Sequence, residues 1–155
     1  MRNGELSATT ASMQDSLITY RGAVYPWHCD HMGHMNVTWY VAKFDEATWN
    51  LFAHVGLTPS SLRDSNHGMA GLEQHITYER ELLAGDVIFV RSWVLEARSK
   101  VLRLRHEMFN GESEERAATM EQTAVYIDRA ARKSRPLPAA VLERAKSLVQ
   151  SPPSD

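Results

Sequence analysis

The clearest pattern along the chain is a run of apolar residues at helical spacing. From Val37, apolar side chains recur every three or four positions as far as Val55, and Gly56 ends the run. Trp39 and Trp49 lie off this stripe, so the predicted helix is apolar on more than one face. A helix of this kind is surrounded by other structure, and we therefore expect it to be the central helix of the fold.

The segments on either side of this helix have the composition of strands. Leu17–Tyr25 is rich in β-branched and aromatic residues and ends at Pro26. After a loop or short helix over Pro59–His67, the residues of Leu72–Arg80 alternate. Its even-numbered positions are mostly apolar, whereas Glu73 and the other odd-numbered positions are polar. This period of two predicts a strand whose side chains alternate between two faces.

Further strand-like runs follow in quick succession and are joined by short turns. They are Val87–Leu95, Val101–Phe109 and Ala117–Ile127, with a turn at Asn110-Gly111 that both residues favour through their tolerance of positive φ, and a helix over Ala139–Val149 closes the chain. Short turns require antiparallel pairing, and the first strand must join the same sheet. The predicted class is α+β, with a curved antiparallel sheet wrapped around one long central helix.

Length and composition indicate one domain. The chain has 155 residues, of which 43% are hydrophobic, enough for a single core. We expect the domain to span residues 17–150, with residues 1–16 and 151–155 disordered because they are polar or rich in proline and serine.

Charge and cysteine content exclude several classes of partner. The net charge is −2 and no long basic run occurs, which argues against nucleic acid. No apolar run approaches the roughly 20 residues of a membrane span, and the polar residues 1–16 lack the apolar centre of a signal peptide. The single cysteine, Cys29, excludes an intrachain disulfide and favours a reducing compartment. The expected location is the cytoplasm.

The candidate site is the segment from His28 to Asn36. It combines several ionisable side chains with Gly33, directly before the predicted helix. Such a segment places the carboxylate of Asp30 beside a helix N-terminus, where backbone N–H groups can stabilise an oxyanion. The alternative for Asp30 is a helix cap or a turn residue.

The neighbours of Asp30 have two interpretations each. His34 and Asn36 either bind the substrate or fix the turn that directs Asp30, and Asn36 is an equally good N-cap. Gly33 provides backbone freedom or close approach of a ligand. A metal site at His28, Cys29, Asp30, His31 and His34 is disfavoured, since the spacing matches no zinc pattern and an extended segment alternates its side chains. Cys29 would point away from Asp30 and is a poor nucleophile.

The chain resembles the hotdog-fold acyl-CoA thioesterases, in the branch that includes 4-hydroxybenzoyl-CoA thioesterase. The matching motif is Asp30-His31-Met32-Gly33-His34-Met35-Asn36-Val37-Thr38-Trp39-Tyr40, supported by Tyr78-x-Arg80-Glu81-Leu82, Gly85-Asp86 and Arg135-Pro136-Leu137-Pro138. The resemblance implies a homodimer or homotetramer built by joining sheets edge to edge, with active sites at the subunit interface. It also implies that Asp30 is the catalytic nucleophile or general base and that N–H groups near Asn36 and Val37 polarise the thioester carbonyl.

Two details of the resemblance concern other residues. The aspartate that the family often carries two positions before the catalytic one is His28 in this chain. Some branches use a glutamate from the region of Glu73 as base or nucleophile, so Glu73 is a second catalytic candidate and otherwise an interface or solvated charge. His75, on the same strand face, is interpreted as structural.

The resemblance implies hydrolysis of a small acyl-CoA without metal or organic cofactor. The chain is also similar to the betainyl-CoA thioesterase subgroup, and Trp27, Trp39 and Trp49 then form either core packing or an aromatic cage for a quaternary ammonium group. The CoA phosphates need cations, for which the basic candidates are Lys100, Arg103, Arg105, Arg132, Lys133 and Arg135, with the densest cluster at 129–135. Alternatives are an enoyl-CoA hydratase using Asp30 and His34, and a non-catalytic acyl-CoA-binding dimer.

Overall fold

The computed structural model of the chain describes residues 16–154. The expected disordered segment 1–16 therefore lies outside the described residues apart from Ser16, and residues 151–154 have no regular secondary structure. The elements are β1 (Leu17–Ala23), η1 (Pro26–His28), α2 (Val37–His54), α3 (Pro59–Ser65), β2 (His67–Tyr78), β3 (Val87–Ala97), β4 (Val101–Asn110), β5 (Arg116–Asp128), β6 (Lys133–Ser134) and α4 (Ala139–Ser147). No helix of the described segment is long and apolar enough to cross a bilayer.

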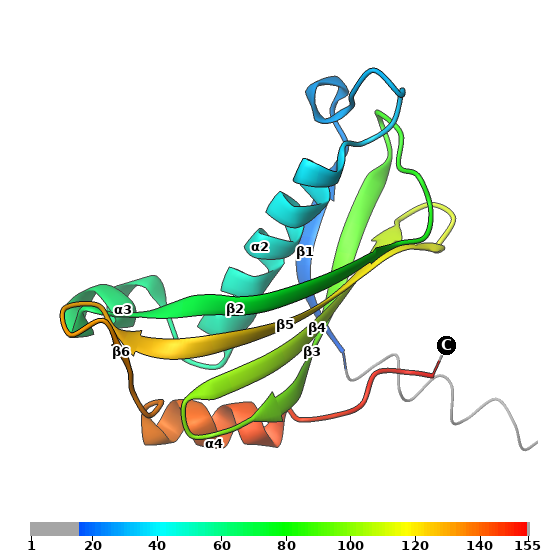
Figure 1. Cartoon of the computed structure of the whole chain (residues 1–155). Helices are drawn as coiled ribbons and strands as arrows, with labels where there is room; N and C mark the ends of the chain where they lie inside the picture. The colour runs from blue at the N-terminus through cyan, green and yellow to red at the C-terminus, as the bar shows by residue number, and fades with distance from the viewer. Residues whose placement is uncertain (1–15, 155) are drawn as a thin grey trace, which may run out of the picture.

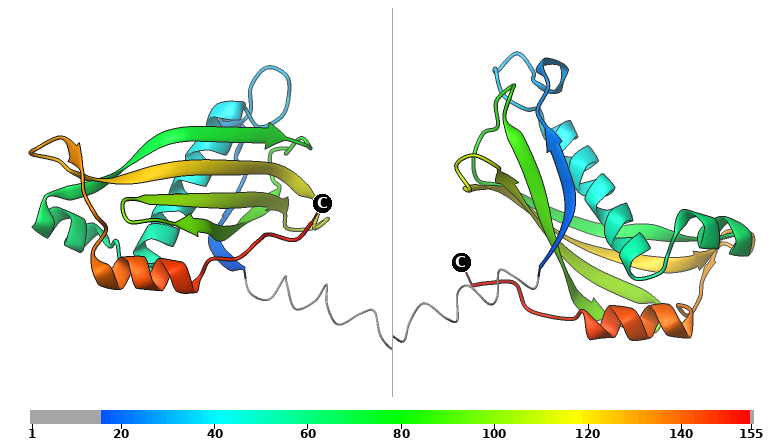
Figure 2. Two further views of the ribbon diagram at one scale, coloured as in Figure 1. Left: turned by 60° about the horizontal axis from the view of Figure 1, so that its bottom comes forward. Right: turned by 180° about the vertical axis from the view of Figure 1, so that it is seen from behind.

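The strands form one antiparallel sheet in the order β1-β3-β4-β5-β2, and the short β6 pairs with β5. The sheet is strongly curved and α2 lies across its concave face (Figure 1). Seen from behind, α2 runs beside β1, while α4 covers the far end of the sheet (Figure 2). The predicted α+β class and hotdog architecture are confirmed.

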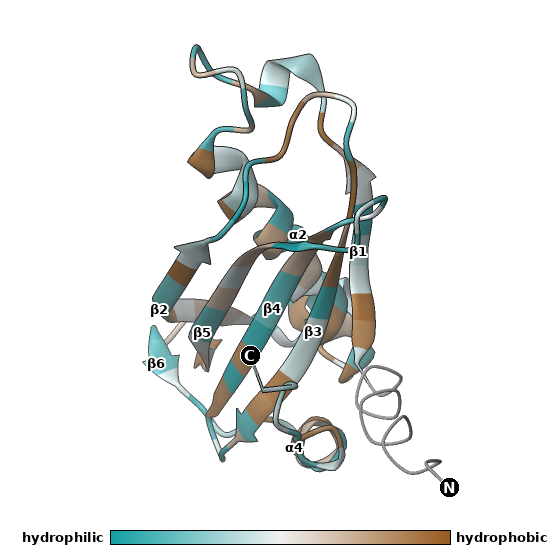
Figure 3. Ribbon diagram, turned by 90° about the vertical axis from the view of Figure 1, so that its right-hand side faces the viewer, coloured by the Kyte–Doolittle hydropathy of each residue, from teal (hydrophilic) through white to brown (hydrophobic). Residues whose placement is uncertain are grey.

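The core lies between α2 and the concave face. The even-numbered residues 102–108 of β4 and 118–126 of β5 are buried against α2, whereas most odd-numbered residues between them are more exposed, and the hydropathy of neighbouring residues differs along these strands (Figure 3). Tyr40, Phe44 and Leu51 of α2 are at most 4% exposed, as the helical apolar pattern predicts. Val37 and Val41 belong to the same stripe but are exposed.

Strand β2 begins at His67, five residues before the strand expected from Leu72. The small residues between His67 and Leu72 hide its strand pattern in the sequence. The pairing register with β5 also shifts between Gly71 and Glu73, which leaves Leu72 in a bulge, 63% exposed. From Glu73 onward the side chains alternate between the two faces as predicted, but only Ile76 is partly buried and the other residues up to Tyr78 are exposed.

The turn expected at Asn110-Gly111 is present, but its mechanism differs from the expected one. Residues 111–115 connect β4 and β5, and the residue with positive φ is Glu114 (φ 59°). Asn110 Oδ1 instead accepts hydrogen bonds from the backbone N–H groups of Glu112 (2.9 Å) and Ser113 (3.1 Å). Side-chain capping by Asn110 therefore stabilises this loop.

A polar row that the sequence pattern does not predict crosses the concave face beneath α2. Its members are Thr19, Ser92, His106, Gln122 and Gln74 from β1, β3, β4, β5 and β2, with Thr48 from α2. His106 is fully buried, its Nδ1 lies 2.6 Å from Ser92 Oγ and its Nε2 lies 3.4 Å from Gln122 Nε2. Burial lowers the pKa of His106 to about 3, so its ring is neutral near pH 7.

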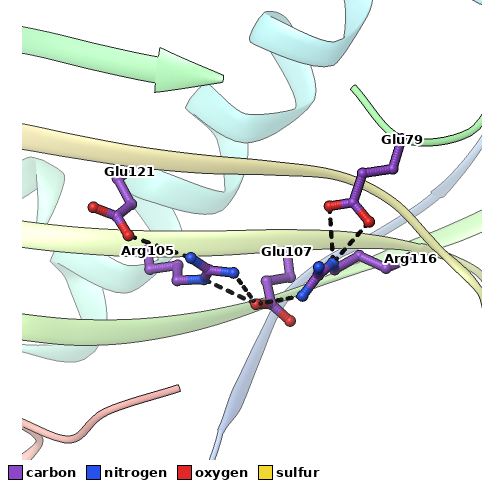
Figure 4. Close-up of polar contacts among 5 residues, drawn as sticks. All are labelled: Glu79, Arg105, Glu107, Arg116 and Glu121. Carbon is purple, nitrogen blue, oxygen red and sulfur yellow. Dashed lines mark hydrogen bonds and ion pairs between the residues drawn. The ribbon is translucent and has the colours of Figure 1, made fainter. Parts of the chain in front are cut away.

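A charged ladder occupies the convex face of the same strands (Figure 4). Glu107 is its centre and accepts from Arg105 (2.8 Å) and Arg116 (3.3 Å). Arg116 also pairs with Glu79 (2.9 Å), and Arg105 with Glu121 (3.3 Å). Glu107 is only 4% exposed, so the two arginines compensate a carboxylate that is largely removed from solvent.

Candidate active site

The segment between η1 and α2 folds into a narrow loop that extends beyond the N-terminus of the helix (Figure 1). Asp30 N–H donates to His34 O (3.2 Å), Gly33 N–H donates to Asp30 O (3.0 Å), and Asn36 N–H donates to His28 O (2.9 Å). Gly33 has φ 85°, and no atom of its surroundings lies within 4 Å of a Cβ placed there. Its predicted role as a source of backbone freedom is the one that this geometry requires.

The carboxylate of Asp30 is held from both sides. Its Oδ2 accepts from Asn36 Nδ2 (2.7 Å) and its Oδ1 from Met32 N–H (2.9 Å). These two bonds, the one from Asn36 above all, lower the pKa of Asp30 below its ordinary value. Asp30 is therefore an oriented anion at neutral pH, with lone pairs still open to solvent.

Asn36 combines the two roles that the sequence left open. Its Oδ1 accepts from Thr38 N–H (3.0 Å) and so caps α2, while its Nδ2 holds Asp30. One amide thus fixes the carboxylate relative to the helix. At the same helix start, Val37 is 53% exposed, and no described residue accepts a hydrogen bond from its N–H. This N–H is a donor available to a substrate oxygen.

The side chain of His34 points toward the carboxylate of Glu81 and not toward that of Asp30. Its Nε2 lies 3.6 Å from Glu81 Oε1, and its Nδ1 lies 3.3 Å from Met35 O. The aspartate–histidine pair that an enoyl hydratase needs is not formed by these two side chains in this arrangement.

The segment after β2 docks onto the site loop. Met35 N–H donates to Leu82 O (2.7 Å), and the Tyr40 hydroxyl on α2 donates to Arg80 O (3.2 Å). Burial raises the pKa of Tyr40 to about 12, which keeps the hydroxyl protonated as a donor. The motif Tyr78-x-Arg80-Glu81-Leu82 therefore belongs to the same site as Asp30, although 48 residues or more separate them in sequence.

Glu73 lies apart from Asp30 within one chain. It follows the register of the convex face, opposite to α2, and lines a shallow cavity of about 170 Å³ together with His75, Arg103 and Glu121. Its neighbour Gln74 faces the concave side, where it bonds Gln122. The structure of a single chain does not bring the two catalytic candidates together.

The histidines and Cys29 of the site diverge. His28 Nδ1 accepts from Tyr25 N–H (3.0 Å), and Cys29 Sγ lies 3.9 Å from Tyr25 O. Within residues 16–154, no three His, Cys, Asp or Glu side chains gather as a metal site would require.

The three tryptophans also do not form a cage. Trp27 stacks on Tyr25 (centroids 4.6 Å apart, interplanar angle 2°), and Trp39 packs on His28 (4.2 Å). Trp49 lies more than two helical turns beyond Trp39 and contacts Phe52 instead. The structure instead brings together an aromatic cluster of Tyr25, Trp27 and His28, from the segment directly before Asp30, with Trp39 of α2. The spacing Tyr25-Pro-Trp-His in the sequence was the signal for it.

The basic candidates divide into paired and unpaired side chains. Arg103 and Arg105 belong to ion pairs on the convex face, and Arg135 pairs with Asp128 (3.2 Å). Arg129 and Arg132, by contrast, line a cavity of about 460 Å³ next to Asn66 and form no ion pair with a described carboxylate.

Comparisons with known proteins agree with this architecture. The family model of the thioesterase-like superfamily matches residues 24–145. A betainyl-CoA thioesterase of Pseudomonas aeruginosa is 30% identical over 139 residues, which are 90% of this chain and 87% of that protein.

Solved structures give the same result. A putative thioesterase from Pseudomonas putida superposes with a TM-score of 0.76 at 28% identity, covering 89% of this chain and 92% of the other. A hypothetical protein from Staphylococcus aureus, solved in complex with CoA, superposes with a TM-score of 0.82 at 22% identity over 90% of this chain and 89% of the other, which shows a shared fold.

Proposed function

The chain belongs to the thioesterase-like superfamily and is a thioester hydrolase, and we propose that Asp30 performs the hydrolysis of an acyl-CoA at the N-terminus of α2. The observation that carries the proposal is the Asn36 amide, which both caps α2 and holds the Asp30 carboxylate (2.7 Å). This bond sets the distance and direction between an anion and a row of helix N–H groups, the two components that acyl transfer needs.

The proposed reaction places the thioester carbonyl oxygen against the N–H of Val37. Asp30 then either attacks the carbonyl carbon, giving an anhydride that water hydrolyses, or takes a proton from the water that attacks. In both routes the C–S bond breaks with release of the CoA thiolate, which is a good leaving group. A strong general acid is therefore unnecessary.

We further propose that two copies pair through β2. Two backbone carbonyls of the other edge strand, β1, already accept from α2: Thr19 O from Asn50 Nδ2 (2.7 Å) and Ala23 O from Lys43 Nζ (3.3 Å). No side chain of the described segment donates to the backbone of β2, and Leu72 on this edge is 63% exposed. Such an open edge is suited to strand addition by a second copy. Whether Glu73 then takes part in the partner's site stays a prediction, as does the cytoplasmic location.

The proposed CoA phosphate site is the cavity beside Arg129 and Arg132. Both guanidinium groups lack carboxylate partners within the described residues, and phosphates are well matched by such cations. Arg103 and Arg105 are less suitable because their charges are already neutralised by glutamates.

We propose that the acyl group of the substrate carries a quaternary ammonium, as in betainyl-CoA. The 30% identical relative named for this substrate supports it, as does the aromatic cluster of Tyr25, Trp27, His28 and Trp39 beside Asp30. Trp27 is 67% exposed, so one face of the stacked pair is open to a cation.

The test measures free-thiol release from acetyl-, medium-chain, aromatic and betainyl-CoA, with crotonyl-CoA followed by loss of enoyl absorbance. We expect turnover with one preferred acyl group and a decrease of at least about 100-fold in kcat for Asp30→Asn. The control is Asp45→Asn, an exposed aspartate in α2 that should retain wild-type turnover. Undiminished turnover in Asp30→Asn would move the catalytic role to another carboxylate, with Glu73→Gln as the next variant.

A further inference from the structure

His28 is the most constrained side chain next to the catalytic loop. The residue is 7% exposed, and its ring packs on Trp39 (4.2 Å) with edge contacts to Tyr25 and Trp27. Its Nδ1 accepts a hydrogen bond from Tyr25 N–H (3.0 Å). The ring therefore joins the start of η1 to the first turn of α2.

The backbone of the same residue is bonded to the residue that holds Asp30. His28 O accepts from Asn36 N–H (2.9 Å), and the Asn36 side chain donates to Asp30 Oδ2 (2.7 Å). A displacement of His28 is thus transmitted through one backbone hydrogen bond to the amide that orients the carboxylate.

The bond from Tyr25 requires an unprotonated Nδ1. In the neutral ring the single proton then resides on Nε2, whereas protonation would place an N–H at Nδ1 against the N–H of Tyr25. Two charged groups face the ring, both from α2: Lys43 opposes protonation and Glu46 favours it. The other side chains packed on it are the aromatic rings of Tyr25, Trp27 and Trp39. Burial is the largest influence and lowers the pKa of His28 below 6.5, in accord with a neutral ring.

We propose that His28 is a positioning residue that keeps the Asp30 carboxylate directed at the substrate only while its own imidazole is neutral. The proposal rests on the proposed function, since Asp30 must be the reacting group. It predicts that acidification reduces kcat through titration of His28.

Two variants test the aromatic ring of His28 and its Nδ1 acceptor separately. His28→Asn keeps an acceptor near the position of Nδ1 and cannot be protonated, whereas His28→Phe keeps a ring on Trp39 and has no acceptor. We expect His28→Asn to retain kcat within about threefold and to lose the acidic decrease in kcat. His28→Phe should lose roughly 10- to 100-fold in kcat with KM changed less than about twofold, because misorientation of a reacting group acts on the chemical step.

The matched control is His31→Gln, an exposed histidine of the same loop, which should keep the wild-type pH profile. The proposal is overturned if His28→Asn keeps the acidic decrease in kcat, if His28→Phe matches the wild type, or if His31→Gln removes the decrease.

A second measurement does not depend on activity. NMR titration of the wild type should show the His28 ring with its neutral-state proton on Nε2, and the side-chain amide signals of Asn36 should shift with the same pKa as His28. In His28→Asn those amide signals should not titrate in this range. If wild-type protein releases no thiol from any acyl-CoA, the proposed function fails, and this titration alone decides the positioning role. Asn36 side-chain amide signals that do not shift as His28 titrates would refute the positioning role.

Discussion

The two faces of the sheet carry polar groups of opposite kinds on the same strands. On the concave face, His106 and Gln122 belong to a buried row of neutral side chains. On the convex face, Arg105 and Glu107 belong to a ladder of charges with partly exposed members. The members of the row that lie under α2 are at most 7% exposed, so their polar groups bond one another. At the outer surface, solvent shares the cost of the charges, so ion pairs are sufficient.

The largest effect is expected from the concave row. His106→Ala removes a fully buried ring and the hydrogen bonds that this ring forms with Ser92 and Gln122. The cavity and the lost hydrogen bonds together should destabilise the fold by roughly 3–5 kcal/mol. Urea unfolding at pH 7 measures this free energy. A loss under about 1 kcal/mol would mean that the row does not hold the sheet to α2.

The second largest effect is expected on acidification, which should lower the free energy of unfolding through His106 of the concave face. The pKa of His106 is about 3 in the fold and 6.5 when exposed, so the unfolded chain binds a proton first as the pH falls. His106 therefore costs no stability above pH 6.5 and should remove about 3 kcal/mol by pH 4. Unfolding free energies at both pH values test this, and His106→Leu should reduce the difference by a similar amount.

A smaller loss is expected at the centre of the ladder. Glu107→Gln removes the charge that Arg105 and Arg116 share, but each arginine keeps a second glutamate, Glu121 or Glu79 (Figure 4). We expect about 1–2 kcal/mol of destabilisation, because the carboxylate is buried while its partners are not. An effect as large as that of His106→Ala would contradict the distinction between the faces.

The end of the ladder should matter least. Arg103 is 45% exposed and lies 3.5 Å from Glu121. Arg103→Ala should change the unfolding free energy by less than about 0.5 kcal/mol, and added salt should shrink that change further. Thermal unfolding at low and high salt measures both quantities. A change above 1 kcal/mol would show that the convex face is more strongly coupled than its exposure indicates.

Periodicity in the sequence was sufficient for the elements and the fold class. The α2 stripe and the strand alternation from Glu73 onward are local patterns, so they survive in the one-dimensional sequence. The start of β2 was missed because residues between His67 and Leu72 are mostly small. The polar row was missed because each member, such as Gln122, is a single polar residue in an apolar stripe. Its partners lie on other strands and become visible only in three dimensions.

The candidate site was predictable where its residues are contiguous. Asp30, Gly33 and Asn36 lie within one loop, and the structure gives each the bonds that its type suggested. The contribution of His28 was not predictable in the same way, because it depends on a ring nitrogen meeting Tyr25 N–H. Likewise, only the assembled sheet shows that Glu73 is on the face opposite to α2.

Lys43 and Asn50 donate hydrogen bonds to the backbone of β1, so β2 is the edge strand that is left open for pairing with another copy. A protomer whose two edges were both open could add copies without limit and would grow into a fibre. Here one edge is occupied by the helix of its own chain. The proposed pairing through β2 therefore uses the edge without such bonds, while the bonds from Asn50 and from Lys43, 3% exposed, disfavour the addition of a further copy at β1.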